Sequence, residues 1–219
     1  MTYLYLAPNW FIKTSIILEV IFALVCTAVA LYSFKVYRLT EQREHRLFGT
    51  AFASIAVSYF IWVFLNIFFL TEIGEGVDAL VVEKLNLLNL FGIYSHIFFF
   101  SLGLVTLAYT VLKVKNLRIY SLLLVLMLFA VVLSKNMSTS FFLLSSIFLF
   151  FISIHYLEEY LKNKSNRKLM IFTAFLFLFL GFLDLTFSIR NYINYIVGHF
   201  LELVAYIIIL ISLVISIKK

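Results

Sequence analysis

Long apolar segments, separated by short polar ones, make up most of this sequence. Hydrophobic residues occupy 64% of the 219 positions and charged residues 13%, a charged fraction about half that of a soluble domain. The last apolar segment runs from Leu203 to Ile217 without a charged side chain. Because a helix needs about 20 apolar residues to cross a bilayer, this pattern predicts an all-α integral membrane protein. It excludes a water-soluble enzyme, a nucleic-acid-binding protein and a disulfide-built secreted module.

The apolar segments predict seven transmembrane helices that form a single membrane domain over residues 1–219. The expected spans are 11–34, 47–70, 87–112, 117–134, 140–157, 169–189 and 192–216. The single cysteine, Cys26, lies within the first span. The chain therefore cannot form an internal disulfide or a cysteine-based metal site.

Basic residues set the expected orientation, because Lys and Arg near the ends of spans are retained on the cytoplasmic side. With the N-terminus outside and the C-terminus in the cytoplasm, all but four of the 17 Lys and Arg residues lie inside. The four exceptions are Lys13, Lys84, Lys135 and Arg190. We therefore predict a multi-pass protein of the plasma membrane in this orientation, surrounded by the lipid bilayer.

Two short matches between the halves of the chain indicate an internal repeat. The second span contains Phe-Leu-Asn-Ile-Phe at 64–68, and the sixth contains Phe-Leu-Asp-Leu-Thr at 182–186. The third span contains Ser-His-Ile-Phe at 95–98, and the seventh contains Gly-His-Phe-Leu at 198–201. One interpretation is a 3+1+3 parallel repeat, in which the fourth span joins two three-helix units. The alternative is chance similarity between helices rich in Phe and Leu.

Five ionisable side chains are expected inside the membrane, roughly 6 to 15 Å below its outer surface. They are Glu19, His96, Asp184, His199 and Glu202. Each would cost a few kcal/mol if it faced lipid, so all five are expected to point into the bundle and to be paired, hydrated or bound to a ligand. The residues expected to support them are Asn66, Asn89, Tyr206 and Arg190.

The chemistry of this set favours a cation. Three ionised carboxylates are not sustainable in a low-dielectric region unless protons or a bound cation balance them. Mixed imidazole and carboxylate ligands suit a divalent metal ion such as zinc, iron or manganese. A b-type haem on His96 and His199, with Arg190 near a propionate, is an alternative that the nearby carboxylates disfavour. The simplest alternative is that each histidine, and each of Asn66 and Asn89, only forms a hydrogen bond between helices.

Three functions are compatible with such a site. The first is a membrane protein that binds a metal ion or another cation, in which a metal-bound water could support hydrolysis; no catalytic residue is predicted. The second is a seven-helix sensor or receptor that signals through a separate cytoplasmic protein bound to the basic inner loops, around 35–46 or 162–168. The third is a proton-coupled carrier of a small solute, because buried carboxylates and histidines are typical of proton pathways.

Overall fold

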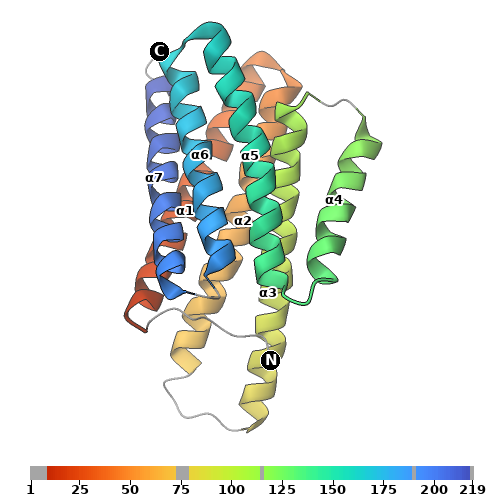
Figure 1. The fold of residues 1–219 in the computed structure, drawn as a ribbon, viewed down its shortest axis with the longest axis vertical. Coiled ribbons are helices and arrows are strands. Elements are labelled where there is room, and N and C mark those ends of the chain that lie inside the picture. The colour runs from red at the N-terminus through yellow and green to blue at the C-terminus, as the bar shows by residue number, and fades with distance from the viewer. Residues whose placement is uncertain (1–8, 73–78, 114–115, 189–190, 218–219) are drawn as a thin grey trace.

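The structure is a computed structural model that describes residues 9–72, 79–113, 116–188 and 191–217. Within these ranges the chain forms seven α-helices and no β-strand: α1 (Asn9–Thr40), α2 (Arg43–Glu72), α3 (Ala79–Val111), α4 (Leu117–Val132), α5 (Met137–Asn163), α6 (Asn166–Phe187) and α7 (Tyr192–Ile217). Figure 1 shows them as a bundle in which the helix axes are roughly aligned. The only proline of the chain, Pro8, precedes α1, so no proline interrupts a helix.

Six of the helices are long and apolar enough to cross a membrane, all except α4. The prediction of an all-helical, multi-pass membrane protein is therefore confirmed at this level. The fourth helix has 16 residues, which corresponds to a length of about 24 Å. Because a bilayer has a hydrocarbon core of about 30 Å, the length and composition of α4 alone do not establish it as a seventh span.

The helices pack as two groups of three. The most extensive contacts join α1 to α2 and α2 to α3 in one group, and α5 to α6 and α6 to α7 in the other. The groups meet where α1 contacts α7 and where α3 contacts α5. The fourth helix contacts only α3 and α5 within the described residues, and it stands at the edge of the bundle (Figure 1).

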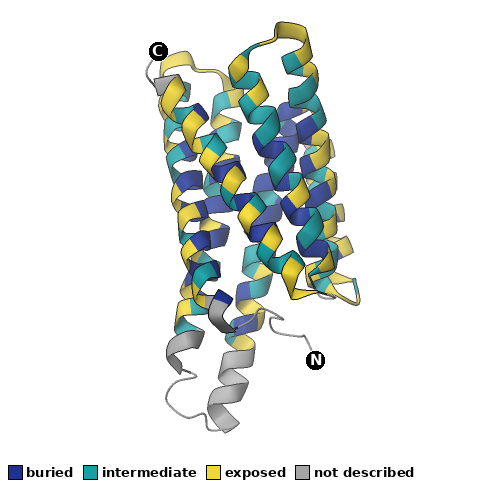
Figure 2. Cartoon of the chain, turned by 60° about the vertical axis from the view of Figure 1, so that its left-hand side comes forward, coloured by how far each residue is buried: buried dark blue, intermediate teal, exposed yellow. Residues whose placement is uncertain are grey.

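Apolar side chains both fill the bundle and cover its outside. Figure 2 shows buried residues along the inward faces of the helices and exposed residues along their outward faces. Many of the exposed side chains are large and apolar, among them Ile17, Leu24, Phe64, Phe91 and Phe129. An outer surface of this kind is compatible with hydrocarbon and not with water.

Polar side chains fix the ends of several helices. Asn116 caps α4 by accepting a hydrogen bond from the backbone N–H of Arg118 at 2.9 Å, as expected for an N-cap asparagine. Lys164 ends α5 in the left-handed conformation, with φ of 44°. Lys168 at the start of α6 forms an ion pair with Glu159 near the end of α5. Of these features, the Lys168–Glu159 pair is the one that joins two consecutive helices, α5 and α6.

Candidate functional site

The seventh helix carries a buried pair of polar side chains. Nδ1 of His199 lies 3.0 Å from Oε2 of Glu202, and the two residues share a helix face because they are three positions apart. Only 6% of His199 and 2% of Glu202 is exposed. A buried polar pair inside an apolar bundle must satisfy its hydrogen bonds internally, so each side chain depends on the other.

Two glycines bring α6 close to this pair. A Cβ atom at Gly181 would lie 3.0 Å from the backbone oxygen of Gly198 and 3.3 Å from Cγ of Glu202. A Cβ atom at Gly198 would lie 2.8 Å from Cγ of Leu185. The absence of side chains at these two positions allows the backbones to approach closely. The close approach places the backbone of α6 at Gly181 directly against the Glu202 side chain.

A second carboxylate, Glu19 of α1, lies beside the pair. Only 2% of Glu19 is exposed, and its Oε2 accepts a hydrogen bond from Nδ2 of Asn66 on α2 at 3.1 Å. The Trp62 side chain also hydrogen-bonds to Glu19. Glu19 interacts electrostatically with both His199 and Glu202. The contacts of α1 with α2 and α7 therefore bring two carboxylates and one imidazole into a single buried cluster, which we call the Glu19–His199–Glu202 cluster.

Aromatic rings enclose this cluster. The Tyr195 ring meets His199 edge-on at 4.5 Å between centroids, and Phe22 stacks on His199 at 6.5 Å. Phe22 also stacks on Tyr206 at 4.7 Å, and the Tyr206 hydroxyl donates to the hydroxyl of Tyr59 at 3.3 Å. The surroundings are largely apolar, so electrostatic interactions inside the cluster are much stronger than they would be in water.

One ring nitrogen of the cluster has no partner. Nε2 of His199 is buried and makes no hydrogen bond to any described residue, whereas Nδ1 faces Glu202. If Glu202 is ionised, it accepts a hydrogen bond from the Nδ1–H group of His199, which leaves Nε2 as the position that can gain or lose a proton. A carboxylate on the opposite nitrogen is also the arrangement that orients a histidine for metal binding.

The other predicted histidine, His96, lies in a different environment. Its Nδ1 is 2.7 Å from Oγ of Ser58 on α2. The rings of Tyr59, Trp62 and Phe100 surround it, with centroid distances of 6.1, 5.1 and 5.9 Å. His96 contacts no carboxylate among the described residues, so the hydrogen-bonded, interhelical alternative describes this histidine better than a role as a ligand.

The remaining predicted residues divide into three cases. Asp184 of α6 is half-buried, and it forms no hydrogen bond or ion pair to a described residue. Asn89 is buried on α3, and Tyr206 forms part of the aromatic enclosure. Arg190 lies outside the described residues. The structure therefore brings together Glu19, His199, Glu202 and Asn66.

The fit of a metal ion or haem can be judged from these positions. No group of three or more His, Cys, Asp or Glu side chains in the described part of the chain has the arrangement of a metal site, so the predicted set of five ligands is not assembled as a unit. A haem held by both histidines does not fit. A continuous set of aromatic rings joins the two imidazoles: Tyr59 contacts His96, Phe22 contacts His199, and Tyr59 and Phe22 contact each other. A porphyrin between the histidines would have to displace these rings.

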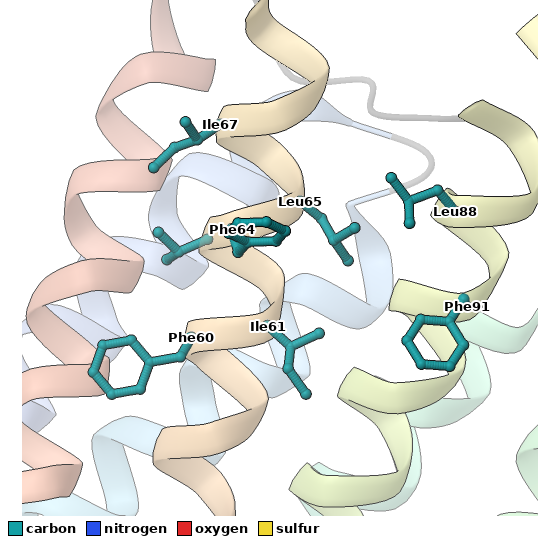
Figure 3. Close-up of a pocket in the computed structure, with 8 residues that line it drawn as sticks. Phe60, Ile61, Phe64, Leu65, Ile67, Leu88 and Phe91 are labelled. Atoms are coloured by element: carbon teal, nitrogen blue, oxygen red, sulfur yellow. The ribbon is translucent and has the colours of Figure 1, made fainter. Parts of the chain in front are cut away.

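A groove of about 590 Å³ lies between α2 and α3 (Figure 3). Its lining is entirely apolar and comprises Phe60, Ile61, Val63, Phe64, Leu65, Ile67, Leu88 and Phe91. Ligand sites normally contain a few polar groups that orient the ligand, and this groove offers none. It is therefore part of the lipid-facing surface and not a candidate solute site.

Comparison of the chain with protein-family models, with curated proteins and with solved structures finds no match. The functional argument therefore rests on the geometry of its own residues.

Sequence reasoning missed Trp62, which hydrogen-bonds to Glu19 and contacts His96. The signal was present, because Ser58, Trp62 and Asn66 follow one another at intervals of four and so share one face of α2. A tryptophan between two polar residues of an inward-facing stripe predicts an indole N–H that needs a buried acceptor.

Proposed function

We propose that this protein is a multi-pass membrane protein whose Glu19–His199–Glu202 cluster reversibly binds a cation, and that this cation is a proton. The observation that carries the proposal is the burial of two carboxylates beside one imidazole whose Nε2 has no partner. No Lys or Arg side chain of the described residues forms an ion pair with either carboxylate.

The charges of the cluster support a proton. With both glutamates ionised and His199 protonated, the cluster carries one net negative charge, and with His199 neutral it carries two. A buried net charge costs several kcal/mol, and Asn66 and Trp62 offset it only with neutral donors. When His199 is already protonated, one further proton on a carboxylate makes the cluster neutral. Proton uptake and release there would change the packing forces between α1 and α7, which is what a proton-coupled carrier or a sensor requires.

Infrared difference spectroscopy between neutral and alkaline buffer, in both of which exposed carboxyls are ionised, tests this proposal on protein reconstituted in neutral lipid. We expect a carboxylic-acid band in the wild type that is lost in Glu19→Gln or Glu202→Gln. The matched control is Glu158→Gln on the exposed end of α5, which should leave the band unchanged. An identical spectrum in the wild type and in both cluster variants would refute proton binding by these carboxylates.

A divalent metal ion is the second candidate, and one observation favours it. The Nδ1 atom of His199 faces the Glu202 carboxylate while Nε2 is unpartnered, which is the orientation of many metal-ligating histidines. Elemental analysis of the purified protein separates the two candidates. Near-stoichiometric zinc, iron or manganese that disappears in His199→Phe would replace the proton proposal with a metal site, whereas absence of bound metal at full folding would reject the metal.

The topology forms part of the same proposal: seven spans including α4, with the N-terminus outside, and a 3+1+3 parallel repeat. Exchanging α1, α2 and α3 for α5, α6 and α7 converts the α1–α7 contact into the α5–α3 contact, which supports the repeat. In this orientation the cluster lies in the outer half of the bilayer. Labelling of Lys164→Cys in a Cys26→Ser background tests the orientation, since an impermeant reagent should reach the new cysteine only from the cytoplasmic side.

A further inference from the structure

A second groove, of about 640 Å³, lies at the opposite end of the bundle from the cluster, between the C-terminal end of α1 and the N-terminal end of α2. It is lined by Leu31, Phe34, Lys35, Tyr37, Arg38, Leu39, Arg46 and Thr50. Three of these side chains are cationic and none is acidic. We infer that this groove binds the headgroup of an anionic phospholipid, with the lipid chain against its apolar part.

The three cations are available to a ligand. Lys35, Arg38 and Arg46 are exposed, and none forms an ion pair within the described residues. The guanidinium of Arg46 lies 5.7 Å from the centre of the Tyr37 ring, a cation–π contact that holds it at the groove. A neighbouring cation, Arg43, is directed away, because it donates to the hydroxyl of Tyr109 on α3 at 3.4 Å.

The groove lies at the level of the bilayer surface. The exposed Lys13 and Lys35 of α1 enclose an apolar segment, and their separation along the helix corresponds to about 33 Å. This is close to the thickness of a hydrocarbon core. With Lys13 at one surface of the membrane, Lys35 and Arg38 therefore lie at the level of the headgroups on the other surface.

The lining of the groove changes from cationic to apolar along its length, which matches the charged headgroup and apolar chains of an anionic phospholipid. The cations occupy its outer part, while Leu31 and Phe34 lie toward the membrane interior. Gly49 on α2 leaves room for the Phe34 ring, because a Cβ atom there would come within 2.9 Å of that ring. The two nearby carboxylates, Glu41 and Glu44, are exposed and do not line the groove. Basic recesses between helices at the headgroup level are typical binding sites for anionic lipids.

Native mass spectrometry of the purified full chain tests the inference with phosphatidylglycerol and phosphatidylcholine as probes. We expect the wild type to retain phosphatidylglycerol preferentially. Each of Lys35→Gln, Arg38→Gln and Arg46→Gln should weaken this binding about fivefold, and the triple variant about a hundredfold. The matched control carries Lys162→Gln, Lys164→Gln and Arg167→Gln at the basic α5–α6 end, and it should bind as the wild type does.

Two further experiments distinguish a bound lipid from other occupants of the groove. Leu31→Asn should weaken phosphatidylglycerol binding severalfold although it changes no charge, and excess inorganic phosphate should not displace the lipid. Circular dichroism shows whether each variant keeps its helices. Equal retention of the two lipids, or equal losses in the control triple variant, would overturn the inference. Displacement of the lipid by phosphate would also overturn it. So would a cytoplasmic protein that co-purifies with the wild type and is lost from the groove triple variant, if that variant still prefers phosphatidylglycerol.

Discussion

The pair formed by His199 and Glu202 predicts strong energetic coupling between two substitutions. His199→Phe keeps an aromatic ring against Tyr195 and Phe22 but removes the partner of Glu202. Glu202→Met keeps the length of the side chain but removes the acceptor that faces Nδ1 of His199. The double variant removes both polar groups and leaves an apolar contact in an apolar bundle.

The magnitudes follow from burial. His199→Phe leaves a carboxylate with 2% exposure without its partner, which costs about 3 to 5 kcal/mol of unfolding free energy. Glu202→Met leaves a buried ring nitrogen unsatisfied, which costs about 1 to 3 kcal/mol. Replacing both members of a buried pair with apolar groups is often close to neutral. We therefore expect the double variant to be more stable than His199→Phe alone. If the double variant is close to neutral, the coupling is about 4 to 8 kcal/mol, the sum of the two single losses.

Reversible denaturation in mixed detergent micelles, followed by tryptophan fluorescence, measures the four free energies of this cycle. The chain offers a control of the same spacing near the C-terminal end of α5, where His155 is half-buried and Glu158 is exposed. His155→Phe and Glu158→Met should each change the free energy by no more than about 0.5 kcal/mol. Additive losses at positions 199 and 202 would refute the reasoning, since they would show that the two side chains do not depend on each other.

Three further outcomes are expected in the same denaturation assay. Asn66→Leu removes the donor to Glu19 and should lower the unfolding free energy by about 1.5 to 3 kcal/mol; no loss would show that this hydrogen bond does not stabilise the buried carboxylate. Gly103→Ala adds a Cβ atom 2.6 Å from a backbone oxygen of α2 and should cost about 1 to 3 kcal/mol, whereas wild-type stability would mean that α2 and α3 separate freely. Lys168→Gln removes the ion pair with Glu159 and should leave the unfolding midpoint almost unchanged, because the pair is only half-buried and ion pairs near the protein surface contribute little; a large drop would contradict that.

The helical fold could be predicted from the sequence because it depends on composition and length. Runs of about 20 apolar residues between charged ends define a spanning helix with almost no reference to tertiary contacts. The prediction was least secure at α4, because its expected span, 117–134, was the shortest with the fifth, and the helix there has 16 residues.

The candidate site could be predicted only in part. Depth along each helix identified Glu19, His199 and Glu202 as buried groups at a similar level, and the structure brings these three together. Depth also placed His96 and Asp184 at that level, but the direction in which a side chain points depends on helix rotation and packing. The rotation of α3 directs His96 toward Ser58 of α2, with which it forms a hydrogen bond. The rotation of α6 leaves Asp184 half-buried. A single sequence carries no information on these rotations.

The measurement that tests the central claim most directly is nitrogen-15 NMR of histidine-labelled protein in lipid, because the chain has only four histidines and the spectrum reports the protonation of each ring nitrogen. Single His→Gln variants assign the signals. We predict that the His199 signal titrates and that Glu19→Gln shifts its midpoint, whereas the His96 signal does not respond to Glu19→Gln. A His199 signal that is the same at every pH and in both proteins would contradict a shared proton in the Glu19–His199–Glu202 cluster.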